Sequence, residues 1–257
     1  MLFDTTHILY ILISSVISAI FLFICSKFIT SEHIKIKILR FSAVITVIIH
    51  FSNLWIDFFT KGQAVLQESQ LFPIHPCNVI MWMLIICAFI KTDSKVFTIL
   101  SEFCFWGGIV CGSIGILLNT NYANTPSLLD YEILKGLVSH STMLFGCIYL
   151  LVGGFVKIRV FNTLSVALGL AIFIVDGLII NTLYSAFNIP ACNSMYLLEL
   201  PFPSMPWLTP LLMGIVGILI VFISTCLYEL RLEKTQRWYN KLRVFLESKN
   251  NIITKGK

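Results

Sequence analysis

The sequence predicts an all-α integral membrane protein, a polytopic bundle of seven transmembrane helices. Three features of the composition point to this class: 57% of the 257 residues are hydrophobic, only 12% are charged, and 21 are phenylalanine. Soluble domains carry about 25% charged residues, so this chain has too few polar side chains to cover a water-facing surface. The composition therefore excludes a soluble enzyme, a disordered protein and a nucleic-acid-binding protein, and it makes lipid the main solvent.

Seven apolar stretches are candidates for membrane-spanning helices, which need about 20 residues to cross a hydrocarbon core of about 30 Å. In chain order they are Ile8–Ile29, Ile38–Phe59, Pro76–Ile90, Val96–Leu118, Ile133–Val156, Val160–Phe187 and Leu208–Tyr228. We expect no removable signal peptide, because the first stretch is too long and Asp4 stands where basic residues would precede it. We therefore expect a multi-pass protein, in the plasma membrane of a bacterium or an endomembrane of a eukaryote.

The basic residues predict the orientation of the bundle. If the seven stretches alternate in direction, one side of the membrane receives only Lys61 and Lys135 of the 18 lysines and arginines. The opposite side receives all the others: Lys27, Lys35, Lys37, Arg40, Lys91, Lys95, Lys157, Arg159 and the basic residues of the C-terminal tail. Because cytoplasmic loops carry the excess of lysine and arginine, the N-terminus is expected outside and the C-terminus in the cytoplasm.

We divide the chain into a transmembrane domain, residues 1–228, and a basic amphipathic tail, residues 229–257. The tail alternates basic with apolar side chains: Arg231, Lys234, Arg237, Lys241 and Arg243 with Leu230, Trp238, Leu242, Phe245 and Leu246. At helical spacing this pattern favours an amphipathic helix on the anionic cytoplasmic leaflet. A solvated tail without regular structure is the alternative.

The third stretch differs from the others because it is short and begins with proline. Pro76 suits the first position of a helix, and His75 before it is held in extended conformation. Pro76–Ile90 makes a helix of roughly 22 Å, so its start is expected below the outer surface. Cys77 then lies in a first turn whose free N–H groups stabilise a thiolate or a developing oxyanion. Alternatively, Cys77 is a packing residue or is paired with Cys192 in a disulfide.

Further polar side chains lie inside the predicted spans, where such residues are costly and are candidates for function. Six fall in the outer half of the membrane and could share one pocket: His50, His75, Cys77, His140, Asn181 and Tyr184. Glu102 and Asp176 lie deeper. A cysteine with a histidine base is the usual arrangement for thioester chemistry, although each histidine could instead make an interhelical hydrogen bond.

Other patterns limit the chemistry that we expect. Gly107, Gly108 and Gly112 favour close helix packing rather than substrate approach. Zinc-ligand spacing, a phosphate-binding glycine loop and a serine nucleophile elbow are missing from the sequence. We therefore expect no cofactor, no metal and no nucleic-acid partner, and membrane phospholipids are the expected partners. The segment from Ile189 to Trp207 contains four prolines and is interpreted as a pocket lid or a rigid connector.

Four stretches occur in a distinctive order: Phe72-Pro73-Ile74-His75-Pro76-Cys77, Phe105-Trp106-Gly107, Ser139-His140 and Asn193-Ser194-Met195-Tyr196-Leu197. In these motifs the chain resembles the YwaF / transmembrane protein 164 family of integral membrane proteins. The resemblance implies a seven-helix fold and, for the eukaryotic branch, a cysteine-dependent acyltransferase acting on lysophospholipids, ether lipids included.

By position, the resemblance makes Cys77 the acyl-accepting nucleophile and His140 the base, with His75 and Asn193 near the pocket. We add Trp106, Asn181 and Tyr196 as expected substrate contacts. The leading hypothesis is transfer of a fatty acyl group between phospholipids through a thioester on Cys77.

Two alternatives remain open at this stage. A transporter or small-molecule-binding protein would use the intramembrane carboxyl groups of Glu102 and Asp176. A non-catalytic assembly factor would use the basic tail and the packing face of Gly108 and Gly112.

Overall fold

The computed structural model describes residues 2–63, 72–189, 193–200, 205–207 and 209–244, and every regular element in these ranges is helical. The α-helices are α1 (Thr5–Phe28), α2 (Glu32–Lys61), α4 (Pro76–Phe89), α5 (Lys95–Leu117), α6 (Thr120–Asn124), α7 (Tyr131–Val152), α8 (Asn162–Ala186) and α9 (Pro210–Glu229). Two short 3-10 helices, η1 (Ser194–Tyr196) and η2 (Lys234–Gln236), lie before and after α9.

Among the residues that the structure describes, five helical segments are long and apolar enough to cross a membrane. They are α1, α7, α8, α9 and the continuous run from the start of α5 to the end of α6. The apolar helix α4 is shorter, and α2 combines an apolar second half with charged residues in its first turns. The expected all-α membrane protein is confirmed at this level.

The helix α4 forms the centre of the molecule. It is 14 residues long, about 21 Å, and its buried side chains cover most of its circumference, while Ile86 and Phe89 on the remaining face are exposed. It packs between α2 and α5, where Phe51 lies edge-on to Trp82 and Ile80 touches the backbone of Gly107. A helix that is apolar all round is stable when other helices or lipid surround it, which explains its composition.

The helices α5 and α7 pack antiparallel at a very short separation. Gly108, Gly112 and Gly115 of α5 face Cys147, Leu144 and His140 of α7 in turn. A Cβ atom on Gly108 would lie 2.2 Å from the sulfur of Cys147, so only glycine fits there. The predicted packing role of Gly108 and Gly112 is confirmed, and the partner of this face is a helix of the same chain.

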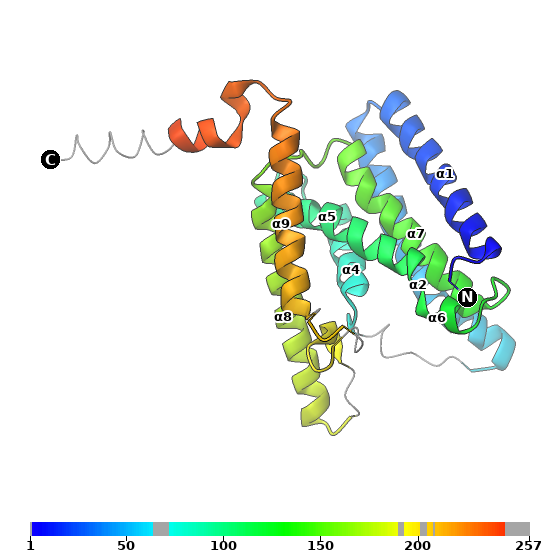
Figure 1. Cartoon of the computed structure of the whole chain (residues 1–257). Coiled ribbons are helices and arrows are strands. Elements are labelled where there is room, and N and C mark those ends of the chain that lie inside the picture. Colours follow the sequence, from blue (N-terminus) through cyan, green and yellow to red (C-terminus); the bar gives the residue numbers. More distant parts are fainter. Residues whose placement is uncertain (1, 64–71, 190–192, 201–204, 208, 245–257) are drawn as a thin grey trace.

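The remaining helices cover this centre from two sides (Figure 1). The helices α8 and α9 lie side by side. The helix α8 packs on α5 near the starts of both helices, where the Ser165 hydroxyl donates to Glu102 and Gly169 packs against Phe103. On the other side, α1 packs on α7 through a hydrogen bond between the hydroxyl groups of Tyr10 and Ser141, 3.0 Å long.

Local chain signals set helix ends that the sequence prediction placed elsewhere. The fifth predicted span, Ile133–Val156, ends as a helix at Val152, because Gly154 turns the chain with a φ of +83°. The short helix α6 was not predicted. Its five residues are too few for a hydrophobic period, and its start is fixed by the Asn119 side chain, which accepts the Tyr122 N–H at 2.9 Å.

Candidate functional site

The start of α4 presents a cysteine in its first turn. His75 is extended, with ψ of 149°, and Pro76 occupies the first helical position, as the sequence predicts. The His75 carbonyl accepts the Asn78 N–H at 2.9 Å, which closes the turn around Cys77. The Cys77 thiol donates a weak hydrogen bond to Asn78 Oδ1 at 3.4 Å, and the backbone N–H groups of Cys77 and Asn78 lie beside its sulfur.

Cys77 carries a free thiol. The proposed pairing partner, Cys192, lies outside the described residues. The thiol is half-buried and packs at the edge of the main hydrophobic core.

Cys111 on α5 is a second free thiol beside Cys77, a neighbour that the sequence did not single out. The two sulfurs are close enough for electrostatic interaction. One turn further along α5, Gly115 lies against the imidazole of His140. Residues four apart on a helix are neighbours on one face, about 6 Å apart along the axis. Cys77 and His140 therefore flank adjacent turns of the same helix.

The hydrogen bond of His140 determines which ring nitrogen is available. His140 Nδ1 lies 2.7 Å from the Gly136 carbonyl, which can only accept, so Nδ1 donates. In the neutral ring, Nε2 then carries the lone pair and is the nitrogen that can take a proton. The structure thus holds His140 in the tautomer that a general base at Nε2 requires.

His75 connects the cysteine to this histidine. Its ring interacts electrostatically with His140 and stacks on Tyr196, with ring centroids 6.0 Å apart. Its Nδ1 is buried and has no hydrogen-bond partner among the described residues. A buried polar atom without a partner costs free energy, so it marks a place where a bound molecule could donate or accept.

The segment Asn193–Leu197 covers the start of α4 in a strained backbone conformation. Asn193, Met195 and Tyr196 have φ of +45°, +54° and +58°, in the left-handed region that side chains rarely adopt. The segment is held to the chain before α4, because the Met195 N–H donates to the Ile74 carbonyl at 2.9 Å. Such strain persists only where surrounding contacts fix it, and it is concentrated at functional sites.

Two asparagines provide those fixing contacts. Asn181 of α8 accepts the Ser194 N–H at 2.8 Å and donates to the Ser194 carbonyl at 3.1 Å. Asn193 accepts the N–H groups of Leu198 and Glu199 and donates to the Glu199 carbonyl. The polar groups of both side chains therefore hold the segment in place.

Of the seven site residues that the sequence predicted, the structure brings four near one another, with His75 stacked on Tyr196: Cys77, His75, His140 and Tyr196. Asn181 and Asn193 lie behind them as supports. Trp106 precedes Cys111 by five residues, about 7.5 Å along α5, and stacks edge-on with Phe105. Its Nε1 is buried without a hydrogen-bond partner.

The deeper carboxyl groups lie elsewhere. Glu102 is half-buried and accepts a hydrogen bond from the Ser165 hydroxyl of α8. One oxygen of Asp176, Oδ2, is buried, and no described residue hydrogen-bonds to it. Within the described ranges, no three histidine, cysteine or carboxylate side chains gather as metal ligands.

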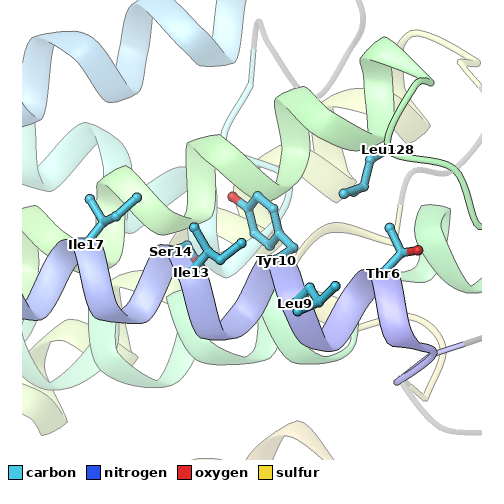
Figure 2. Close-up of a pocket in the computed structure, with 7 residues that line it drawn as sticks. All are labelled: Thr6, Leu9, Tyr10, Ile13, Ser14, Ile17 and Leu128. Atoms are coloured by element: carbon cyan, nitrogen blue, oxygen red, sulfur yellow. The ribbon is translucent and has the colours of Figure 1, made fainter.

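A separate apolar cavity lies along α1 (Figure 2). It has a volume of about 410 Å³ and is lined by Thr6, Leu9, Tyr10, Ile13, Ser14, Ile17 and Leu128. None of these residues belongs to α4 or to the Asn193–Leu197 segment. The cavity is therefore not part of the cluster around Cys77.

Comparison with known proteins agrees with this architecture. No curated protein and no solved structure matches the chain. The model of the TMEM164 family matches residues 2–229, from the start of the described chain to the end of α9. The match includes the cluster of Cys77, His75, His140 and Tyr196, and it ends where the basic tail begins. With nearly the whole bundle matched, this membrane protein belongs to the TMEM164 family.

Proposed function

We propose that the protein transfers a fatty acyl group between phospholipids through a thioester on Cys77. The observation that carries the proposal is the clustering of a free first-turn thiol with His75 and His140, because a nucleophile and an oriented base are the parts that this chemistry needs. The membership in the TMEM164 family agrees with a lipid-embedded site.

In the first step, the Cys77 sulfur attacks the carbonyl carbon of a donor phospholipid ester. The S–C bond forms, the thiol proton passes to His140 Nε2, and the carbonyl oxygen becomes an oxyanion. The backbone N–H groups at the start of α4 are the donors for this oxyanion. When the ester C–O bond breaks, the proton on His140 goes to the departing oxygen and a lysophospholipid leaves.

In the second step, a lysophospholipid hydroxyl attacks the thioester. His140 takes the hydroxyl proton as the new ester bond forms, and the proton returns to sulfur when the C–S bond breaks. The sum is an exchange of one acyl ester for another, so no oxidant, metal or nucleotide is consumed.

The neighbouring residues take positioning roles in this scheme. The unpaired Nδ1 of His75 faces the polar part of the substrate. Tyr196 stacks on the His75 ring and covers the site on that side. Asn181 and Asn193 hold that cover in place. Trp106, deeper on α5, lines the path of the acyl chain and offers its unpaired Nε1.

The helix directions support seven membrane crossings. The helix α5 packs antiparallel to α7, and α8 starts near the start of α5, where Ser165 bonds to Glu102. The helix α2 is antiparallel to α7, since Thr46 lies at Thr142 and Lys35 at Tyr149. The end of α9 meets the start of α8 through Glu229 and Val160, and the start of α1 meets the end of α5 through His7 and Ile116. With the basic residues counted as above, the N-terminus lies outside, and the end of the bundle where α9 stops faces the cytoplasm.

Acyl transfer in reconstituted vesicles tests the proposal. The full chain is supplied with a labelled phospholipid and an unlabelled lysophospholipid acceptor. We expect Cys77→Ala to remove transfer, and His140→Ala to lower it about 10²–10⁴-fold, the usual contribution of a general base. The matched control is Cys226→Ala, a free thiol on α9. Full transfer by folded Cys77→Ala protein contradicts the proposal.

A transporter is the second candidate, and one observation favours it: the buried, unpaired Oδ2 of Asp176 inside α8. That reading predicts solute uptake that Asp176→Asn removes and Cys77→Ala leaves unchanged. The assembly-factor alternative loses part of its basis, because Gly108 and Gly112 face α7 of the same chain.

A further inference from the structure

The chain beyond α9 is fixed to the bundle by one buried carboxylate. Glu229, the last residue of α9, is 2% exposed. Its Oε1 accepts the Val160 N–H at 2.9 Å, and its Oε2 accepts the Trp238 N–H at 2.6 Å. Val160 lies just before α8, and Trp238 begins the helical segment 238–244. Glu229 therefore sets where this tail helix starts.

A second group of bonds sets the direction in which the tail leaves. Arg237 folds back and donates from Nε to the Leu232 carbonyl at 3.0 Å and from Nη2 to the Leu230 carbonyl at 2.8 Å. These bonds close a tight turn directly after α9. As a result, the tail helix extends sideways from the end of α9 and away from the bundle (Figure 1).

The tail helix has one apolar side with basic residues beside it. At about 100° per residue, Trp238, Leu242 and Tyr239 fall within one sector of about 100°. Lys241 and Arg243 fall on its two flanks. The first turn packs on the bundle through Trp238 against Phe222 of α9, and Tyr239 and Leu242 are exposed.

We propose that the segment 231–244, with the tail helix 238–244 lying on the membrane surface, binds the anionic phospholipid headgroups of the adjoining leaflet. The turn at Arg237 places the helix across the direction of α9, hence along the membrane plane. Trp238 and Leu242 enter the interface, and Lys234, Lys241 and Arg243 meet the headgroups. This surface does not depend on the acyl-transfer chemistry proposed above, since it lies beyond the last helix of the bundle.

Hydrogen exchange of the amides of residues 239–244 tests this inference on the full chain in vesicles. We expect at least tenfold slower exchange in phosphatidylcholine containing phosphatidylglycerol than in phosphatidylcholine alone. High salt should reverse most of the difference, because it screens exposed charges. Lys241→Gln combined with Arg243→Gln should also remove it. Equal exchange rates in the two kinds of vesicle, fast or slow, overturn the inference.

The matched control is Lys91→Gln combined with Lys95→Gln. Both lysines are exposed: Lys91 lies between α4 and α5 and Lys95 is the first residue of α5, at the same end of the bundle but outside the tail. The control variant should keep the full difference between anionic and neutral vesicles. If it loses the difference as the tail variant does, the total charge of the bundle end accounts for the effect, and the assignment to the tail helix is wrong.

Discussion

The imidazole of His140 lies directly against the backbone of Gly115. A Cβ atom built on Gly115 would be 2.0 Å from His140 Cδ2 and 2.3 Å from Nε2. The Gly136 carbonyl holds the ring at Nδ1, and Gly115 contacts it at Cδ2 and Nε2, so the ring is fixed at both edges. The close approach of α5 to α7 thus fixes the orientation of the base.

Gly115→Ala should displace this ring. The added methyl group has no space, so we expect a loss of about 1–3 kcal/mol in the free energy of unfolding. Acyl transfer should fall more than the stability loss explains, because Nε2 moves. Denaturant unfolding and transfer assays measure the two effects.

The control for that substitution is Gly217→Ala on α9, where a Cβ atom meets nothing within 4 Å. It should leave both unfolding and transfer unchanged. If Gly115→Ala behaves like this control, His140 is not held as described.

Asn181→Ala should release the cover of the site. It removes both hydrogen bonds to Ser194, and a buried backbone group left without a partner costs about 1–3 kcal/mol. The strained segment around Tyr196 then relaxes, and the Met195 amide exchanges faster with solvent. Ser185→Ala, one turn further along α8 and exposed, is the control and should leave this exchange rate unchanged.

The start of α1 should lose protection in acid. Hydrogen bonds from the His7 N–H and the Tyr122 hydroxyl lower the pKa of the Asp4 carboxyl below its ordinary value. A lowered folded-state pKa stabilises the fold fully above the ordinary pKa of about 3.9, and this stability is lost as the pH falls through the folded-state value. The protection factor of the His7 amide, followed from pH 6 to pH 2, measures the loss.

Asp4→Asn is the matching variant, because asparagine also caps a helix but does not titrate. Its His7 protection should be independent of pH over the same range. The same acid loss in this variant would assign the effect to another group.

Glu229→Gln should weaken the junction between the bundle and the tail. A carboxylate accepts N–H groups at both oxygens, whereas the amide group of glutamine has one acceptor and presents hydrogens at the other position. One of the bonds to Val160 and Trp238 is therefore lost, at about 1–3 kcal/mol. Thermal unfolding measures this loss of stability. Glu233→Gln, at an exposed position in the same turn, is the control and should leave the unfolding temperature unchanged.

The apolar runs made the helices predictable, since each buries a continuous hydrophobic sequence in lipid or protein. The start of α4 was predicted to the residue, because Pro76 leaves few choices for the backbone. The end of α7 was placed four residues too late, because the turn at Gly154 depends on local φ rather than on hydropathy.

The site was less predictable than the spans. Cys111 was missed because a lone cysteine inside an apolar run has no signal of its own, and its nearness to Cys77 arises from the packing of α4 on α5. The left-handed backbone at Met195 and Tyr196 has no sequence marker either, since glycine is absent there. The predicted depth in the membrane put Cys77 and His140 in the same outer half. In the structure both residues lie near the same end of neighbouring helices.

The most direct test of the central claim is capture of the thioester. The purified chain is incubated with phospholipid, and its intact mass is read before and after neutral hydroxylamine. We predict an adduct of one fatty acyl group that hydroxylamine removes, that Cys226→Ser keeps and that Cys77→Ser lacks. An unmodified wild-type chain under conditions where acyl transfer proceeds, or an adduct that persists in Cys77→Ser, would contradict the account.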